Sequence, residues 1–194
     1  MIPATHTSEP SQGTPAVFLD RDGTINVEKG YLHRIDDWEW VAGAPEAIMH
    51  FNQAGFKVVI VSNQAGIARG MYRAEDVDKL HSFVSDELHK IGASIDAFYY
   101  CPHHPKHGEE LYCTCRKPAP GLLQRAAQDL SIDLSKSWMI GDKLIDIEAG
   151  QAVNAATILV LTGYGAKAAI CADPSQLIVE NLLSACQYIL NHGM

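Results

Sequence analysis

The chain has 194 residues, of which 47% are hydrophobic and 20% are charged, and its formal net charge is -8. These values are typical of one globular domain with a sizeable core, and they exclude a disordered or fibrous chain. Since general binding to nucleic acids or to anionic membranes requires clustered Lys and Arg, the acidic balance argues against both.

The N-terminal residues 1–15 mix Pro, Ser, Thr and Gly and have neither a basic start nor an apolar stretch. We interpret them as a flexible tail, followed by a single domain over residues 16–194. No run approaches the roughly 20 apolar residues that span a bilayer, so we expect a cytoplasmic protein. We also expect it to be a monomer.

Short apolar runs alternate with helical patterns along the rest of the chain. The runs read as buried strands and cover residues 16–19, 58–61, 97–100, 138–140 and 157–161. Helices are expected over residues 44–53, 77–91, 120–130, 146–152 and 182–190. In the second of these, one face of the helix is apolar and consists of Val77, Leu80, Val84, Leu88 and Ile91. This alternation predicts a three-layer, Rossmann-like α/β fold with a mainly parallel sheet and helices on both faces.

Two carboxylates follow the first predicted strand in the run Asp20-Arg-Asp22-Gly-Thr. Two residues apart on extended backbone, they point to the same side. One carboxylate can attack phosphorus to give an acyl-phosphate, while the other protonates the leaving group and later activates water. The pair therefore indicates phosphoryl transfer, although acidic turn residues in solvent give the same short pattern.

Further polar residues stand at the ends of later strands or in loops. The strand end Ser62-Asn63-Gln64 offers a hydroxyl and two amides to phosphate oxygens, and Arg116-Lys117 offers fixed cations. The run Gly-Asp142-Lys143, with Asp146 beyond it, supplies carboxylates suited to Mg2+. Because ligands bind beyond the carboxyl ends of parallel strands, these groups are expected to form one site.

A cluster of cysteines and histidines lies between the third strand and the Arg116-Lys117 pair. Its ligands suit a closed tetrahedral Zn2+ site of structural type, in a reducing compartment, and we assign them as Cys101, His103, Cys113 and Cys115. His104 or His107 could replace His103. Since Cys115 directly precedes Arg116, a bound zinc ion would hold the two cations ready for phosphate.

With D-R-D-G-T, S-N-Q, R-K-P and G-D-K-L-I-D as its motifs, the chain resembles the haloacid dehalogenase superfamily of phosphatases over residues 16–161. The resemblance implies that Asp20 is the nucleophile and Asp22 the general acid and base. It further implies that Ser62 and Lys117 hold the phosphoryl group.

The same resemblance implies a catalytic Mg2+ ion. Asp142, a carboxylate oxygen of Asp20 and the backbone carbonyl of Asp22 would bind it, with Asp146 orienting these ligands from outside. The segment between Asp22 and Ser62 already holds a loop and a helix, so it leaves no room for a large cap domain. We therefore expect an open site that loops shape.

Within the superfamily, the zinc loop and the runs G-Y-L-H, S-N-Q-A-G-I-A-R-G and Y-Y-C-P-H-H-P are similar to those of the heptose-bisphosphate phosphatases. This resemblance implies hydrolysis of the 7-phosphate of a heptose 1,7-bisphosphate, in the synthesis of nucleotide-heptose for lipopolysaccharide core. It implies substrate contacts from Glu28, Lys29, Gly30, Tyr31, Asn63, Gln64, Ala65, Arg116 and Lys143. Ser62 and Ala65 stand where Thr and Ser are frequent, so the chain keeps the hydroxyl at the first position and loses it at the second.

Two alternatives remain open. Histidinol-phosphate phosphatases share the motifs and a similar zinc loop, but their substrate carries an ammonium where heptose carries a second phosphate. Arg116 suits a phosphate better than a cation, which favours the sugar bisphosphate. The second alternative, from another class, is a zinc-stabilised binding module without catalytic activity.

Overall fold

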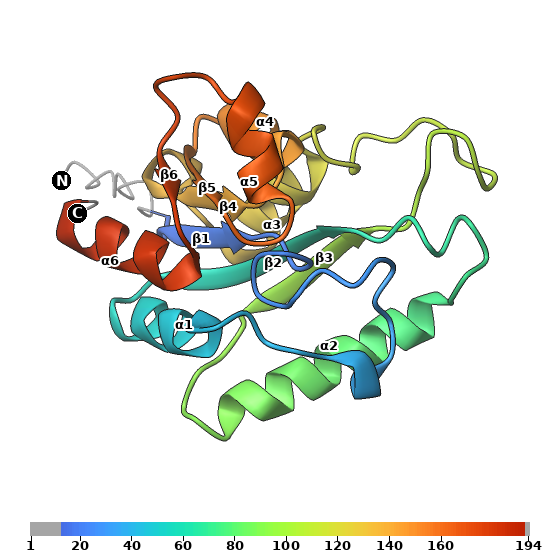
Figure 1. Ribbon diagram of the computed structural model, residues 1–194, viewed down its shortest axis with the longest axis horizontal. Helices are drawn as coiled ribbons and strands as arrows, with labels where there is room; N and C mark the ends of the chain where they lie inside the picture. Colours follow the sequence, from blue (N-terminus) through green and yellow to red (C-terminus); the bar gives the residue numbers. More distant parts are fainter. Residues whose placement is uncertain (1–12, 193–194) are drawn as a thin grey trace, which may run out of the picture.

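The structure is a computed structural model that describes residues 13–192. Within them, six strands form one parallel sheet in the order β3-β2-β1-β4-β5-β6 (Figure 1). The strands are β1 (Ala16–Leu19), β2 (Lys57–Asn63), β3 (Ala97–Cys101), β4 (Trp138–Gly141), β5 (Ala156–Val160) and β6 (Ile178–Val179). Apolar runs buried on both faces are typical of parallel sheets, and all four residues of β1 are buried.

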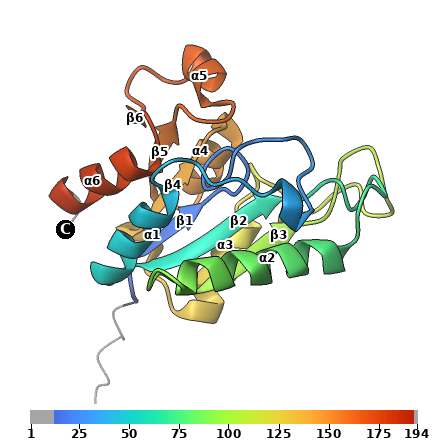
Figure 2. The ribbon, with the colours of Figure 1, turned by 60° about the horizontal axis from the view of Figure 1, so that its bottom comes forward.

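Helices cover both faces of the sheet. They are α1 (Ala44–Gln53), α2 (Ala74–His89), α3 (Gly121–Leu130), α4 (Leu144–Gln151), α5 (Gly165–Ala168) and α6 (Leu182–His192), with 3-10 turns at Ile35–Asp37, Leu134–Lys136 and Ala169–Cys171. Figure 2 shows α2 in front of β2 and β3 and α3 behind them. The predicted three-layer architecture is confirmed.

The alternation of side chains along the strands divides the core into two clusters. Val17 and Leu19 of β1 face the side of α1, α2 and α6, where Phe51 packs against them. Ala16 and Phe18 point to the opposite face, toward α3 and α4. Burial on both sides therefore holds β1 in the middle of the sheet, which places the residue after it at the centre of the carboxyl edge.

Several boundaries differ from the sequence prediction. β2 continues through Ser62 and Asn63, and α5 and β6 were not predicted. Ile91 was placed on the buried stripe of the second helix, but this was wrong: α2 ends at His89, and Ile91 is 49% exposed. Gly92, which has a φ of 74°, turns the chain away from the helical path directly after Ile91.

The predicted N-terminal tail is only partly described. Residues 1–12 lie outside the described residues, as do residues 193 and 194 of the predicted domain. The backbone N–H of Thr14 donates to the carbonyl of Ser131, and the carbonyl of Thr14 accepts from the N–H of Asp133, both at 3.0 Å. The division into a tail over residues 1–15 and one domain over residues 16–194 stays a prediction.

The sheet order brings the polar strand ends together. β2, β1 and β4 are neighbours, so Ser62, Asp20 and Asp142 meet at one carboxyl edge. The connection from β1 to β2 contains only a 3-10 turn and α1, and it forms no large cap. Among residues 13–192, no helix combines the length and the apolar character that a bilayer crossing requires.

Candidate active site

Asp20 directly follows β1 and is buried. Its Oδ1 accepts a hydrogen bond from Nζ of Lys117 at 2.8 Å, and its Oδ2 lies 3.7 Å from Nζ of Lys143. Burial by itself would raise the pKa of Asp20, but the charges of the two lysines outweigh it and hold the pKa below its usual value. Asp20 is therefore ionised at neutral pH, which is the form that a nucleophile needs.

Lys117 holds Asp20 from the loop before α3. Its Nζ also donates to the carbonyl of Val61 at 2.6 Å and pairs with Oδ1 of Asp146 at 2.7 Å. Burial disfavours the charge, but Asp146 and Asp20 together raise the pKa of Lys117 above its usual value. The site thus contains a fixed ammonium beside the ionised Asp20 carboxylate.

Asp22 is surrounded by hydrogen-bond donors. Nη2 of the buried Arg21 lies 2.9 Å from its Oδ1 and 2.8 Å from its Oδ2. Asn26 donates to Oδ1 at 3.0 Å, and Gln64 donates to Oδ2 at 3.2 Å. The carboxyl group is therefore held in one orientation. Sequence reasoning missed Arg21 and Asn26, although both lie in the same short run as the two aspartates.

The amides at the end of β2 are bonded to the protein itself. Gln64 donates to Oγ of Ser62 at 2.6 Å and accepts from the hydroxyl of Tyr72 at 2.7 Å. Asn63 donates to the carbonyl of Lys117 and accepts from its N–H, both at 3.0 Å. These side chains orient Ser62 and Lys117, and their direct contact with substrate stays a prediction. Burial raises the pKa of Tyr72 to about 12, so Tyr72 keeps its proton as a donor.

Asp142 directly follows β4 in the chain and is completely buried. Its Oδ2 accepts a hydrogen bond from the backbone N–H of Tyr164 at 2.8 Å. Gly23 and Gly163 both have positive φ, and a Cβ on either would lie 2.1 or 2.2 Å from this Oδ2. Only glycine fits this close approach. Burial and the charge of Asp20 raise the pKa of Asp142 to about 7, so the pair of carboxyl groups is suited to a cation.

The ammonium of Lys143 shows where a cation fits among these oxygens. Its Nζ lies 2.8 Å from Oδ1 of Asp142, 3.3 Å from the carbonyl oxygen of Asp22 and 3.7 Å from Oδ2 of Asp20. These residues supply the three oxygens that the family resemblance implies for Mg2+. An all-oxygen set with two carboxylates suits this ion.

Asp146 lies close to this cluster, and one ligand atom each of Asp20, Asp142 and Asp146 fall within 4.8 Å of one another. Its Oδ1 pairs with Lys117, and its Oδ2 accepts the backbone N–H of Lys143 at 3.0 Å at the start of α4. Burial raises the pKa of Asp146 to about 6, against the opposing charge of Lys117. Since both oxygens are engaged, Asp146 is placed to orient the site.

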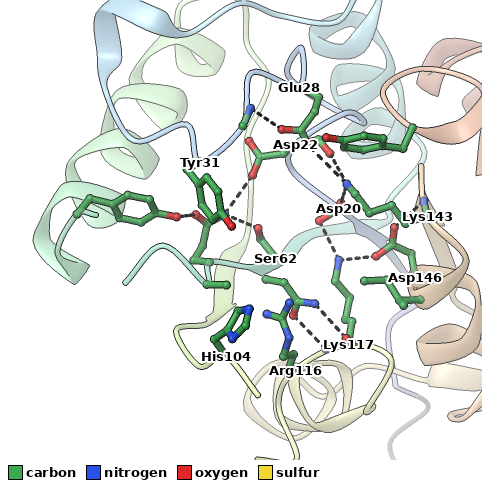
Figure 3. A pocket seen from close by; sticks show the side chains of 17 residues that line it. Asp20, Asp22, Glu28, Tyr31, Ser62, His104, Arg116, Lys117, Lys143 and Asp146 are labelled. Carbon is green, nitrogen blue, oxygen red and sulfur yellow. Dashed lines mark hydrogen bonds and ion pairs between the residues drawn. The ribbon is translucent and has the colours of Figure 1, made fainter. Parts of the chain in front are cut away.

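Asp20, Asp22, Ser62, Lys117, Lys143 and Asp146 line one cavity of about 290 Å3, whereas Asp142 is buried behind its wall (Figure 3). Of the predicted substrate residues, the lining includes Glu28, Gly30, Tyr31, Asn63, Gln64, Ala65, Arg116 and Lys143. Lys29 does not line it and pairs with Glu39 at 2.9 Å. Four further lining residues, Tyr72, His104, Ile145 and Tyr164, were not predicted to contact substrate. His104 was considered only as an alternative zinc ligand, and the signal at Tyr164 was a glycine-flanked loop after a strand.

The predicted zinc ligands come together beside this cavity. Ligand atoms of Cys101, His103, Cys113 and Cys115 lie within 4.8 Å of one another. Sγ of Cys101 is 3.6 Å from Sγ of Cys113, and Nδ1 of His103 is 3.3 Å from Sγ of Cys115. A tetrahedral zinc site with bonds of about 2.3 Å to sulfur has edges of about 3.5 to 3.8 Å, so the four residues fit this ion. His103 faces the thiols, while a neighbouring histidine, His104, has its ring nitrogens near Arg69 and Lys106.

The second ring nitrogen of His103 has a carboxylate partner, because its Nε2 lies 3.0 Å from Oε2 of Glu110. Such pairs fix the orientation and the basicity of a metal-binding histidine. We expect Glu110→Gln to weaken zinc binding about 10-fold or more, as measured by competition with a chromogenic chelator. Glu109→Gln is the matched control, since Glu109 forms no ion pair among residues 13–192. Equal zinc affinity in the two variants would contradict a role for Glu110.

The zinc loop is tied to the cations that follow it. Nη1 of Arg116 donates to the carbonyl of His103 at 3.2 Å, and Gly121 donates its N–H to the carbonyl of Thr114 at 2.9 Å. Lys117, by contrast, is held mainly by β2 and by the carboxylates. The loop therefore positions Arg116 more directly than Lys117.

A carboxylate that is held ionised, and that opens into a cavity with cations on its walls, can accept a phosphoryl group. The fold and the site thus define a phosphatase, in which Asp20 is the candidate nucleophile. The HAD-hydrolase-like family model matches residues 114–185. A D-glycero-beta-D-manno-heptose-1,7-bisphosphate 7-phosphatase of Photorhabdus laumondii is 48% identical over 157 residues, which cover 79% of this chain and 84% of that protein. The chain therefore belongs to this phosphatase family of HAD-like hydrolases.

Further relatives agree. The Haemophilus ducreyi protein of the same name is 39% identical over 185 residues, or 91% of this chain and 99% of that protein. The crystal structure of D,D-heptose 1.7-bisphosphate phosphatase from B. bronchiseptica, complexed with magnesium and phosphate, superposes with a TM-score of 0.83. It is 31% identical and covers 91% of this chain and 98% of that one. The protein is a phosphoric monoester hydrolase, and the non-catalytic module has no support.

Proposed function

We propose that the protein hydrolyses the 7-phosphate of D-glycero-D-manno-heptose 1,7-bisphosphate. The observation that carries this proposal is the ionised Asp20 at the base of a cavity whose wall includes Arg116 and Lys117. The names of the relatives supply the sugar, and those names specify the beta anomer for those proteins. Such a product serves nucleotide-heptose synthesis for lipopolysaccharide core.

In the first step, a carboxylate oxygen of Asp20 forms a bond to phosphorus as the bond from phosphorus to the sugar oxygen breaks. Asp22 gives its proton to that leaving oxygen. In the second step, Asp22 takes a proton from water, the water oxygen bonds to phosphorus and the acyl-phosphate bond to Asp20 breaks. Ser62 and Lys117 hold the phosphoryl oxygens throughout.

Two metal ions belong to the proposal. Asp142, Asp20 and the carbonyl of Asp22 would hold Mg2+, which offsets the negative charges of the phosphate and the carboxylates when bound. The cluster of three cysteines and His103 would hold a structural Zn2+. Thiolate ligands of this kind need a reducing compartment, so a cytoplasmic location is part of the proposal, as is a monomeric state.

The structure favours a sugar bisphosphate over histidinol phosphate. Histidinol phosphate would need an anion to receive its ammonium group. Among the carboxylates that line the cavity, the one without a role in catalysis or in orienting the site is Glu28. Its Oε1 already accepts the N–H of Gly30 at 2.8 Å, and its Oε2 lies 3.6 Å from Nζ of Lys143. Both oxygens are therefore engaged with donors of the protein itself.

A phosphate-release panel tests the proposal. It compares both anomers of heptose 1,7-bisphosphate, histidinol phosphate and fructose 1,6-bisphosphate by kcat/KM in the presence of Mg2+. We expect the beta heptose bisphosphate to exceed histidinol phosphate by about 100-fold or more, since a site with unmatched charges discriminates strongly. A preference for histidinol phosphate would overturn the substrate and leave the mechanism intact.

A further inference from the structure

We propose that Arg69 and His104 form, together with Arg116, a binding site for the second phosphate of the substrate at the outer edge of the cavity. This inference rests on the proposed function, because it identifies the part of the same cavity that distinguishes a bisphosphate from a monophosphate. Among these residues, only Arg116 is marked as a substrate residue by the sequence motifs.

His104 lines the cavity next to Arg116 (Figure 3). Its Nδ1 lies 3.0 Å from the backbone N–H of Lys106, and its Nε2 lies 3.1 Å from Nη2 of Arg69. A neutral imidazole accepts at one nitrogen and donates at the other. The Lys106 N–H and the Arg69 guanidinium are both donors, but a neutral His104 ring has only one acceptor nitrogen. One of the two contacts therefore brings two N–H donors together.

An anion resolves this conflict. The Lys106 N–H is a fixed backbone donor and takes Nδ1 as its acceptor, which leaves the proton of His104 on Nε2, facing Arg69. A phosphate oxygen placed between them would accept from Nε2–H and from the Arg69 guanidinium together. Hydrogen bonds from charged donors to phosphate are among the strong ones.

Charge points to the same conclusion. Although the chain has a net charge of -8, neither Arg69 nor Arg116 nor Lys106 has a carboxylate partner among the ion pairs of residues 13–192. Nine other Lys and Arg side chains in this range do pair with an acid, namely Arg21, Lys29, Arg34, Lys57, Lys90, Lys117, Arg125, Lys136 and Lys143. The edge of the cavity at His104 is thus a cluster of uncompensated cations.

Arg69 does not itself line the cavity, but it contacts two residues that do, Tyr31 and His104. Its Cζ lies 5.5 Å from the ring centroid of Tyr31, which lines the cavity from the loop after β1. A guanidinium over an aromatic ring at this distance is attracted by the ring. Arg69 therefore bridges Tyr31 and His104, and its charge lies directly behind the cavity wall where we place the second phosphate.

The test compares substrates with and without the second phosphate. For each variant, the ratio of kcat/KM for heptose 1,7-bisphosphate to kcat/KM for heptose 7-phosphate is measured. We expect Arg69→Gln to lower this ratio about 10- to 100-fold, as the loss of a charge-assisted hydrogen bond implies. His104→Ala should lower it less, and Arg125→Gln should leave it unchanged. Arg125 of α3 is the matched control because, like Arg69, it lies over a tyrosine ring: its Cζ is 5.9 Å from the ring centroid of Tyr99.

An unchanged ratio in Arg69→Gln would overturn the inference, even if both activities fell, because a merely structural role affects the two substrates alike. If the unmodified protein cleaves no heptose phosphate, the proposed function fails instead. The inference is then decided by the same ratio for fructose 1,6-bisphosphate and fructose 6-phosphate, and it is overturned if Arg69→Gln leaves that ratio unchanged.

Discussion

Asp20→Asn is expected to lower kcat for phosphate release by at least about 10,000-fold, because an amide oxygen cannot act as the nucleophile. Asparagine has nearly the shape of aspartate and still offers an acceptor to Nζ of Lys117, which lies 2.8 Å away. The measurement is phosphate release under saturating substrate and Mg2+. Circular dichroism and zinc content establish that the variant is folded.

Asp22→Asn provides the comparison that separates the two carboxylates. In the first step Asp22 protonates the leaving group, so in Asp22→Asn the rate of phosphoenzyme formation, measured in a single turnover, should fall severely for a sugar phosphate and much less for p-nitrophenyl phosphate, whose leaving group needs no proton. The loss in Asp20→Asn should be the same for both. Radiolabelled phosphate should also attach to the unmodified protein and not to Asp20→Asn. Equal activity of Asp20→Asn and the unmodified protein would exclude Asp20 as the nucleophile.

Removal of zinc is expected to raise KM by about 10- to 100-fold while kcat and the affinity for Mg2+ change little. The reason lies in how the two cations are held. Arg116 is bonded to the carbonyl of His103 inside the zinc loop, whereas Lys117 is fixed by Asn63, Val61 and the carboxylates. Loss of zinc should therefore release Arg116 and leave the phosphoryl contact of Lys117 in place.

Cys115→Ser is the variant for this experiment, and Cys171→Ser is its matched control, because Cys171 is exposed and lies outside the cluster. Metal analysis should find one zinc per chain in the control and none in Cys115→Ser. The melting temperature of Cys115→Ser should also fall, since zinc binding stabilises its loop. A folded, zinc-free variant with an unchanged KM would show that the loop and substrate binding are independent.

Much of the active centre was predictable because catalytic chemistry requires particular residue types at strand ends. The positions of Asp20, Ser62 and Asp142 follow from apolar runs that stop at a polar residue, and a parallel sheet brings such residues to one edge. The zinc ligands were predictable for a similar reason, since their close spacing in the chain limits what they can bind.

Other residues carried no such signal. Tyr72 and Arg69 come from the segment after β2, and their partners Gln64 and His104 become neighbours only through folding. The same holds for Glu110, which reaches back to His103 across a turn of the loop. No periodicity or motif specifies a contact of this kind, because it depends on the path of an irregular loop.

The sequence by itself determined the class of the fold, and it predicted the attacking aspartate and the ligand types of both metal sites, because these depend on side-chain chemistry and on local spacing. Only the tertiary structure decided which groups are free to meet a substrate. It showed that Asn63, Gln64 and Glu28 are engaged within the protein, and that Arg69 and Arg116 lack a carboxylate among the described residues. Hydrogen bonding and charge pairing are settled between segments far apart in the chain, so they exist only once the chain has folded.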